Sequence, residues 1–224
     1  MMRAENKKKI FLIFDILGTI FPWKESFRFL NLFSQLKLRP RLPEDELRGL
    51  LRNRIDSFFK DGKTALQRFF QDAYWLNSPE EAALAVEMFE ETLLREAEIH
   101  PKAHEVLQQL SRDYTLLVCS DTTGETGKMV EKWRIKRYFT REFYSNELHL
   151  TKSKEFYELV VKSFPGSVPA QYVSIGDSLR SDIAYPKSLG MKTIWVRNEA
   201  LGSDDAKPDY TVDDLADIAD LLKK

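Results

Sequence analysis

The sequence predicts an α/β fold in which a parallel sheet, covered by helices on both faces, is interrupted by an inserted unit of four helices. Short apolar runs alternate with segments of helical periodicity along most of the 224 residues. Between about residues 22 and 98, helical periodicity alone remains. Alternating strands and helices are typical of a parallel sheet, and the purely helical stretch indicates an insertion after the first strand.

The first expected strand is the apolar run over residues 10–14, which Asp15 follows directly and Gly18 and Thr19 follow within a few residues. A continuous apolar run of this length is typical of a strand buried on both faces. Open α/β sheets place their chemistry at the carboxyl ends of such strands. Asp15 is therefore a candidate nucleophile or metal ligand.

The insertion begins near Pro22 and contains four expected helices, at residues 24–37, 44–59, 64–76 and 79–98. Ser78, Pro79 and Glu81 mark the start of the fourth, because Ser caps the first turn, Pro fits its first position and the acid follows three residues after the cap. Four amphipathic helices suffice for a small bundle, and we expect its many Phe side chains to form the bundle core.

After residue 100, helices and strands alternate to the end of the chain. The expected strands lie at 114–119, 143–145, 172–175 and 193–196. The expected helices lie at 102–112, 125–133, 155–163, 183–189 and 212–222. A surface loop is expected at 199–207. The expected domains are therefore a sheet domain, residues 1–21 and 99–224, and the helical insertion, residues 22–98.

Composition excludes several classes of function. The formal net charge is −1 and the isoelectric point is near 6.4, so no strong field attracts nucleic acid or an anionic membrane. No apolar run is long enough to span a bilayer. The lone Cys119 cannot form a disulfide within the chain, which fits a reducing compartment. We expect a cytoplasmic protein with no nucleic-acid or membrane partner.

Polar residues also follow two of the later expected strands, with a lysine between them: Ser120 and Asp121, then Lys152, then Gly176, Asp177 and Asp182. Together with Asp15, this order resembles the haloacid dehalogenase-like (HAD) hydrolase superfamily. The resemblance covers nearly the whole chain and implies a Rossmann-like core with an α-helical cap inserted just after the first motif. Residues 190–196 and 208–210 look like the next strand and the final short strand of that superfamily.

The resemblance implies that Asp15 attacks an electrophile, most often phosphorus, and forms an aspartyl intermediate that water then hydrolyses. Ser120 donates a hydrogen bond to a phosphate oxygen, and Lys152 neutralises charge on the nucleophile and on the transferring group. Gly18 lets the backbone come close to a phosphate, and the Thr19 hydroxyl holds the loop or donates to Asp15. Asp121 is expected to line the mouth of the same site.

The motif lysine has a near neighbour, because Lys154 lies two residues after Lys152. The Lys-Pro pair usual for this motif is absent, since Ser153 follows Lys152. We favour Lys152, because the acidic helix start at Glu155 and the aromatic pair after it follow at roughly the family spacing.

Three carboxylates at neighbouring strand ends, Asp15, Asp177 and Asp182, form a cluster of like charge that requires a cation. Mg²⁺ prefers oxygen ligands and keeps several waters, so Asp15, Asp177 and one backbone carbonyl suffice when a substrate phosphate completes the shell. The resemblance implies that the carbonyl is that of Leu17 and that Asp182 acts mainly from behind the direct ligands.

Leu17 departs from the family pattern, since HAD phosphatases usually carry a second Asp two residues after the nucleophile. That Asp protonates the leaving oxygen and then activates water, contributions of about 10²- to 10⁴-fold each. Leu can do neither, so esters of ordinary alcohols should be poor substrates, whereas aryl or acyl phosphates could still react.

Three accounts of function follow. The first is a Mg²⁺-dependent phosphatase of a small phosphorylated metabolite, with weakened activity or with an acid such as Glu25 supplied by the cap. The second is a 2-haloacid dehalogenase, in which Asp15 attacks carbon and halide leaves unprotonated. The third is a non-enzymatic regulatory or binding protein on the same scaffold. A monomer and a homodimer are both compatible with the sequence.

Overall fold

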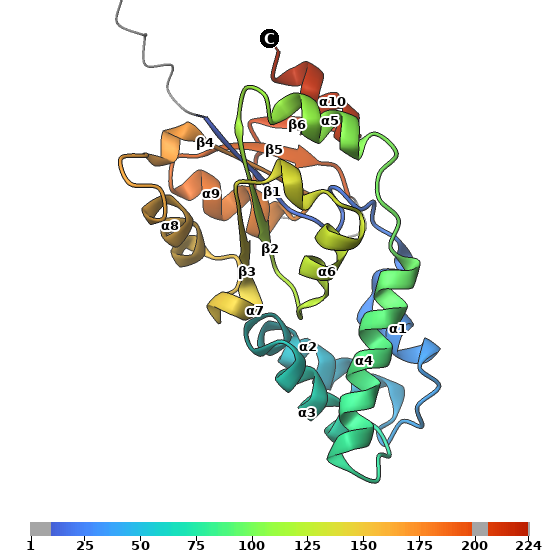
Figure 1. Cartoon of the computed structure of the whole chain (residues 1–224). Coiled ribbons are helices and arrows are strands. Elements are labelled where there is room, and N and C mark those ends of the chain that lie inside the picture. The colour runs from blue at the N-terminus through green and yellow to red at the C-terminus, as the bar shows by residue number, and fades with distance from the viewer. Residues whose placement is uncertain (1–9, 199–205, 224) are drawn as a thin grey trace, which may run out of the picture.

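The structure, a computed structural model, describes residues 10–198 and 206–223. Its centre is a six-stranded parallel sheet in the order β3-β2-β1-β4-β5-β6 (Figure 1). The strands are β1 (Phe11–Phe14), β2 (Thr115–Ser120), β3 (Arg141–Tyr144), β4 (Tyr172–Gly176), β5 (Lys192–Val196) and β6 (Tyr210–Val212). The expected Rossmann-like α/β fold with an inserted helical unit is confirmed.

Alternate residues of the strands face two different apolar clusters, as the pleat of a sheet requires. Leu12 and Phe14 of β1 belong to one cluster, and Phe11 and Ile13 to the other. The first face is covered by α5 (Ala103–Leu110), α6 (Glu125–Lys132) and α10 (Leu215–Leu221). The second is covered by α8 (Lys154–Lys162) and α9 (Tyr185–Ser188). The central strands β1, β2 and β4 are therefore buried on both faces, which explains their continuous apolar runs in the sequence.

Strand β1 lies between β2 and β4, and this order positions the site. Phe14 pairs with Val118 on one side and with Ile175 on the other. The chain leaves β1 toward one edge of the sheet and later returns to the other side of it at β4. Ligands of open α/β sheets bind at such a switch point, beyond the carboxyl ends of the strands.

The inserted segment forms α1 (Phe29–Gln35), α2 (Glu44–Asp61), α3 (Lys63–Ala73) and α4 (Pro79–Glu96), below the sheet in Figure 1. The first helix is shorter than predicted. Residues 25–27 form a separate 3₁₀ turn, and extended backbone at Arg28, with ψ 132°, breaks the expected helix. The single helix expected at 24–37 is therefore a 3₁₀ turn followed by a seven-residue α-helix.

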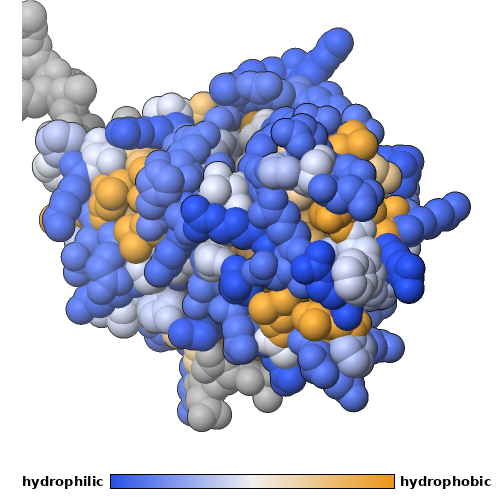
Figure 2. Space-filling model, turned by 90° about the horizontal axis from the view of Figure 1, so that it is seen from below, coloured by the Kyte–Doolittle hydropathy of each residue, from blue (hydrophilic) through white to orange (hydrophobic). Residues whose placement is uncertain are grey.

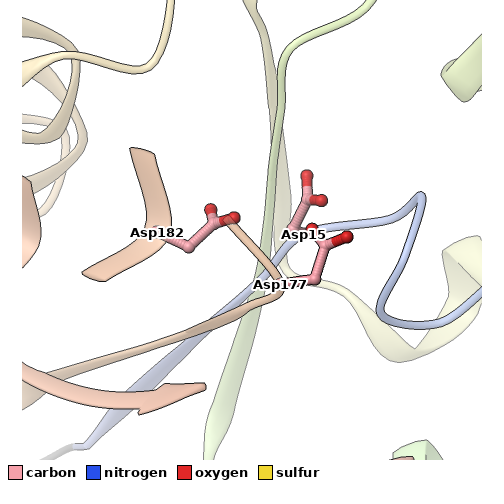
Figure 3. A group of neighbouring side chains, drawn as sticks. All are labelled: Asp15, Asp177 and Asp182. Carbon is pink, nitrogen blue, oxygen red and sulfur yellow. The ribbon is translucent and has the colours of Figure 1, made fainter. Parts of the chain in front are cut away.

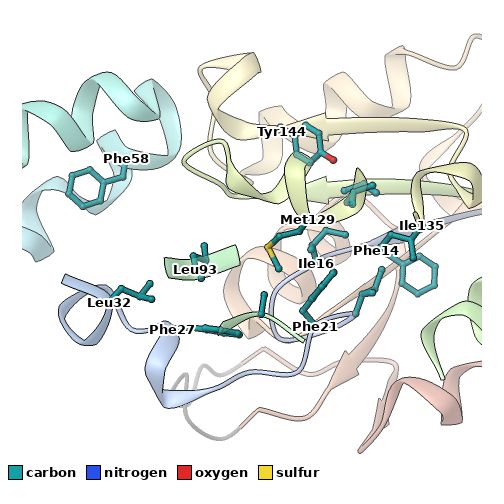
Figure 4. Close-up of a cluster of buried hydrophobic side chains, with 14 of the residues drawn as sticks. Phe14, Ile16, Phe21, Phe27, Leu32, Phe58, Leu93, Met129, Ile135 and Tyr144 are labelled. Carbon is teal, nitrogen blue, oxygen red and sulfur yellow. The ribbon is translucent and has the colours of Figure 1, made fainter. Parts of the chain in front are cut away.

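Phenylalanines fill the inserted helical unit, as expected. The ring centroid of Phe33 lies 5.0–5.6 Å from those of Phe69, Phe70 and Phe89, in tilted or edge-on arrangements, and all four rings are buried. The same apolar cluster continues without interruption to the sheet, where Phe27 and Leu93 approach Phe21 and Met129 (Figure 4). The helical unit and the sheet domain therefore share one hydrophobic core.

An ionic contact also joins the two units. The carboxylate of Glu90 on α4 is 2% exposed and accepts hydrogen bonds from Lys63 on α3 and from Lys128 on α6, each at 2.7 Å. Both ammonium groups are about half exposed, whereas the carboxylate is not. One buried negative charge is thus shared by a lysine of each unit.

The C-terminal half differs from the prediction in three places. The helix expected at 183–189 is a π-helix over Leu179–Ala184 that continues into α9, with Ser178 as its N-cap. The last helix starts at Leu215 rather than 212, because residue 212 still belongs to β6 and Asp214 caps the helix. The short α7 (Ser145–Leu148) was not predicted. Most of the loop expected at 199–207 lies outside the described residues.

The lower end of the molecule, where the inserted helices lie in Figure 1, is largely hydrophilic, and its apolar side chains gather in separate patches (Figure 2). Within the described ranges 10–198 and 206–223, no helix is long and apolar enough to cross a membrane.

Ser78 is the N-cap of α4, as predicted: its hydroxyl accepts from the backbone N–H of Glu81 at 3.3 Å. Ser78→Ala should lower the free energy of unfolding by about 1 kcal/mol, because one N–H of the first turn loses its partner. Ser78→Asp keeps an acceptor and should stay within about 0.5 kcal/mol of the wild type. Urea denaturation of the three proteins measures the difference, and equal losses in both variants would contradict the capping role.

Candidate active site

A cavity of about 830 Å³ opens between the carboxyl ends of the strands and the inserted helices. Its wall on the sheet side is almost entirely polar, and comprises Asp15, Leu17, Ser120, Asp121, Glu125, Lys152, Asp177, Ser178 and Ser181. Its wall on the helical side is mostly apolar, and comprises Trp23, Glu25, Phe27, Arg28, Phe29, Leu30, Asn31, Leu32, Arg48, Leu51, Arg52, Ile55, Phe59, Phe89 and Leu93. The volume lies in the range of about 300–1,000 Å³ that is usual for small-molecule sites.

Asp15 lies on the floor of this cavity, one residue beyond the end of β1. Its backbone N–H donates to the carbonyl of Ile175 at 2.9 Å, so the sheet ladder fixes its position. Its Oδ1 accepts a hydrogen bond from Lys152 Nζ at 2.9 Å. Within the part of the chain that the structure describes, Oδ2 accepts no hydrogen bond. One carboxylate oxygen is therefore held, and the other is available to a ligand.

Lys152, rather than Lys154, lies in the site. Its ammonium group is also 2.6 Å from Asp182 Oδ1, and the residue is 5% exposed. Its backbone N–H donates to Asp121 Oδ1 at 2.8 Å. Ser153 caps α8 through its hydroxyl, which turns Lys154 outward to solvent. Ser153 thus starts the helix and separates the two lysines.

The three carboxylates predicted to meet at the strand ends do meet. Oxygens of Asp15, Asp177 and Asp182 lie within 4.8 Å of one another, and all three residues are buried (Figure 3). Asp177 lines the cavity beside Asp15 and accepts from Asn198 Nδ2 at 2.7 Å. Asp182 lies behind them: Lys152 occupies one of its oxygens, and the backbone N–H of Ser178 donates to the other at 3.1 Å.

Two glycines make room for these side chains. A Cβ at Gly18 would lie 1.8 Å from Asp177 Oδ2, and a Cβ at Gly176 would lie 2.2 Å from Asp182 Cγ. Gly18 also has φ +84°, in the left-handed region that other residues rarely adopt. The expected close approach of backbone at Gly18 is thus an approach to Asp177.

The electrostatics of the cluster show an excess of negative charge. Burial, together with the Asp15 and Asp182 carboxylates, raises the pKa of Asp177 to about 8. Burial also raises the pKa of Asp182 to about 7, although Lys152 acts in the opposite direction. Burial alone would lower the pKa of Lys152, but Asp15 and Asp182 raise it well above its usual range, so the lysine stays charged.

This donor set fits a hard divalent cation. With all three carboxylates ionised, the single ammonium group would leave two negative charges uncompensated, both on oxygen atoms, and the raised pKa values of Asp177 and Asp182 reflect that excess. Mg²⁺ takes oxygen ligands and few protein groups, which suits Asp15 and Asp177 on the cavity wall. The residues present therefore fit the metal that the sequence predicts.

The remaining predicted residues lie nearby with different surroundings. Ser120 ends β2 and its hydroxyl makes only a long bond, 3.4 Å, to the Asp121 carbonyl. Burial raises the pKa of Asp121. Thr19 differs from the expectation: its buried hydroxyl has no hydrogen-bond partner within the described ranges, so it neither holds the loop nor donates to Asp15. Leu17 lines the same cavity as Asp15 and Asp177, and its side chain has no proton to donate.

Several groups of the site escaped the prediction from sequence. Asn198 and Trp195 hold Asp177, the latter through a 2.8 Å bond from its indole N–H to the Asp177 carbonyl. Glu125 begins α6 on the cavity wall, and burial raises its pKa. Glu25, the suggested acid of the cap, lines the cavity and pairs with Arg28 at 2.7 Å. Asn198 follows the apolar run of β5 at the same sheet edge, which is a signal that could have found it.

Gly18→Ala should disturb the carboxylate cluster, because the added methyl group would occupy the position of the Asp177 carboxylate. We expect the rise in Tm on addition of Mg²⁺ to be lost or much reduced. Gly49→Ala is the matched control, since Gly49 lies within α2 and nothing lies within 4 Å of a Cβ there. This variant should raise the free energy of unfolding by about 1 kcal/mol and keep the rise in Tm with Mg²⁺. An unchanged response in Gly18→Ala would refute the metal site.

Lys152→Met should lower the free energy of unfolding by about 3–5 kcal/mol, because two buried carboxylates lose their counter-charge. Lys154→Met, two residues away and exposed, should change it by no more than about 0.5 kcal/mol. Denaturant titration of both variants in the absence of Mg²⁺ gives the comparison. Equal effects would show that the buried ion pairs do not support the fold.

Known proteins resemble the chain both in sequence and in structure. Residues 152–218 match the family model described as HAD-hydrolase-like. The pyrimidine 5′-nucleotidase PynA of Streptococcus pneumoniae is 32% identical over 127 residues, which cover 54% of this chain and 53% of that protein. The matched part of the chain thus spans about half the length of this curated relative.

Solved structures agree in fold over nearly the whole chain. The HAD-hydrolase YfnB of Bacillus subtilis, solved with bound magnesium, has a TM-score of 0.70 at 18% identity and covers 97% of this chain and 100% of that one. A HAD phosphatase of Thermococcus onnurineus has a TM-score of 0.70 at 21% identity, and the match covers 96% of this chain and 97% of that one. A 2-haloacid dehalogenase of Pseudomonas syringae also has a TM-score of 0.70 at 20% identity, and the match covers 96% of this chain and 98% of that one. Residues 152–218 thus resemble the HAD-hydrolase-like family, and nearly the whole chain shares the fold of solved HAD hydrolases.

Proposed function

We propose that the protein is a Mg²⁺-dependent phosphatase that acts on a small phosphorylated metabolite through an aspartyl-phosphate intermediate on Asp15. The observation that carries the proposal is the buried cluster of three carboxylates around Lys152 on the polar floor of a cavity. The pyrimidine 5′-nucleotidase relative supports a phosphorylated substrate. The substrate's phosphoryl group would lie between Asp15 and the polar residues at the end of β2.

Lys152 and Ser120 position and stabilise the transferring group. The Lys152 ammonium remains charged and orients the Asp15 carboxylate through Oδ1. The hydroxyl of Ser120, which makes only a long hydrogen bond in the described structure, donates to a phosphoryl oxygen. Both groups are buried, and an interaction with developing charge is strongest where water is excluded.

Asp15 Oδ2 is the nucleophilic atom. It attacks phosphorus, and the bond from phosphorus to the ester oxygen breaks, with its electron pair leaving on that oxygen. Water then attacks phosphorus of the aspartyl phosphate, which releases phosphate and restores the carboxylate. Position on the fixed end of β1 compensates for the weak nucleophilicity of a carboxylate.

Asp15, Asp177 and the carbonyl of Leu17 would hold Mg²⁺, and Asp182 would support them through Lys152 and Ser178. When bound, Mg²⁺ neutralises charge on the phosphoryl oxygens and permits the approach of an anionic substrate to the carboxylates. The two glycines beside Asp177 and Asp182 keep the carboxylates close enough for that purpose.

Leu17 restricts the leaving group. Because Leu17 occupies the cavity wall where the acid would lie, an alkoxide would have to leave unprotonated. Phenolate and carboxylate groups leave without a proton, so aryl and acyl phosphates are the substrates that this site can process. Water also lacks its usual base in the second step, which would make hydrolysis of the intermediate slow.

The 2-haloacid dehalogenase is a second candidate, and Leu17 favours it because halide needs no proton. In that reaction Mg²⁺ has no role, and Lys152 would be the only cation beside three buried carboxylates in the described part of the chain. The acidic cluster therefore favours the phosphatase. Loss of catalysis, with the fold retained for binding or regulation, is the third account.

The sheet domain of residues 1–21 and 99–224 would supply the chemistry, and the cap of residues 22–98 would select the substrate. The cavity between them supports this division of labour. The buried, unpaired Cys119 supports a reducing compartment such as the cytoplasm.

Phosphate release from p-nitrophenyl phosphate and acetyl phosphate should depend on Mg²⁺, stop with chelator and be absent in Asp15→Asn. Leu17→Asp should raise hydrolysis of an alkyl phosphate, such as glycerol phosphate, by about 10²- to 10⁴-fold, because it restores an acid beside the leaving oxygen. Leu17→Asn is the matched control: it has nearly the same shape as Asp but no exchangeable carboxyl proton, and should give no gain.

Each of the other accounts has its own result. Turnover of a 2-haloacid that persists with chelator would favour the dehalogenase. No phosphate release from either activated substrate, in the wild type or in Leu17→Asp, would contradict the phosphatase and leave the binding protein.

A further inference from the structure

The two walls of the cavity differ in chemistry. Leu17 is the one apolar side chain that the sheet domain contributes, within the described residues, whereas aromatic and aliphatic groups such as Phe29, Phe59 and Ile55 dominate the helical wall. A phosphoryl group on the floor fills only the polar end of about 830 Å³. The rest of the cavity fits an apolar body attached to that phosphoryl group.

One face of α2 provides much of this helical wall. Arg48, Leu51, Arg52, Ile55 and Phe59 line the cavity, and their spacings of three, one, three and four residues place them on one side of the helix. Apolar and cationic groups therefore alternate along the side of α2 that a bound molecule would contact.

Arg52 differs from the other arginines of the cavity in its surroundings. Arg28 pairs with Glu25 at 2.7 Å, and Arg48 pairs with Glu44 one turn earlier in α2. The guanidinium of Arg52 has no ion pair or hydrogen bond with any residue that the structure describes. A planar guanidinium on the wall of an apolar pocket matches the geometry of a carboxylate or a phosphate oxygen pair.

We infer that the helical wall is a second subsite, which binds an apolar, ring-containing body that carries an anionic group, and that Arg52 is the residue that selects the anionic group. This inference deepens the proposed phosphatase and rests on it for the position of the phosphoryl end. The substrate class is an aryl or acyl phosphate with a second anionic substituent remote from the phosphoryl group.

Two independent features agree on this class. The lack of an acid at Leu17 requires a leaving group that departs as a stable anion, such as a phenolate. The aromatic wall formed by Phe29, Phe59 and Phe89 independently fits a planar ring, since aromatic groups pack against one another in stacked or edge-on arrangements. The arginine then distinguishes an acidic aryl phosphate from a neutral one.

The test uses phosphonates, which cannot be hydrolysed, so binding is measured whether or not the protein is a phosphatase. Phenylphosphonate is compared by calorimetry, with Mg²⁺, to p-carboxyphenylphosphonate and to the longer p′-carboxybiphenylylphosphonate. We expect Arg52→Gln to weaken the binding of at least one carboxylated compound by about tenfold. The binding of phenylphosphonate should weaken by less than about twofold. Arg52→Lys should give an intermediate loss, because it keeps the charge without the planar fork.

Arg68→Gln is the matched control, since Arg68 is exposed on neighbouring α3 and does not line the cavity. It should leave all three affinities unchanged. Three results would each overturn the subsite. These are an equal loss of affinity for carboxylated and plain phosphonates in Arg52→Gln, no loss of affinity for any compound, and no binding of the compounds to the wild type. Hydrolysis of the matching phosphates tests the proposed function separately, so either idea can fail alone.

Discussion

The contact of one lysine with two aspartates is the interaction on which the rest of the site depends. Lys152 Nζ lies 2.9 Å from Asp15 and 2.6 Å from Asp182, and these carboxylates belong to segments 167 residues apart in the chain. Without that ammonium group, the ends of β1 and β4 would bring like charges together in a buried place. The lysine itself reaches the site because Asp121 accepts its backbone N–H and Ser153 starts α8 directly after it. The order of the strands, the loop before Lys152 and the start of α8 together place the Lys152 ammonium group between the two carboxylates.

Charge is abundant in this site, whereas proton donors at the leaving group are not. Asp15, Asp177 and Leu17 all line the cavity, so the proposed site would bind and polarise a phosphoryl group far better than it would protonate an alkoxide. In such a site, substrate selectivity would depend on the chemistry of the leaving group and on the residues of the helical wall. The apolar composition of that wall, interrupted by Arg52, is consistent with this division.

Much of this arrangement could be predicted from sequence, because the informative residues lie at the ends of apolar runs. Asp15 and Asp177 follow buried strands, and the order of strands in a parallel sheet brings such ends together. Residues whose role depends on contacts between distant segments could not be predicted in this way. The break at Arg28 divides a helix that periodicity favours, and Thr19 has a suitable hydroxyl but no hydrogen-bond partner among the described residues. Arg52 resembles any surface arginine until the helix is placed over the cavity.

The shared carboxylate of Glu90 bears on how the cavity could admit its ligand. Lys63 belongs to the same helical unit as Glu90, whereas Lys128 belongs to the sheet domain. Of the two contacts of Glu90, a hinge motion of the helical unit away from the sheet would break only that of Lys128, and Glu90 would keep a counter-charge throughout. At Glu90, the electrostatic work of such a motion is therefore that of exchanging one partly exposed lysine for water, a quantity that rises in dilute buffer and falls as ionic strength increases. Salt concentration would then act on the rate of ligand entry without changing the contacts of the carboxylates on the cavity floor.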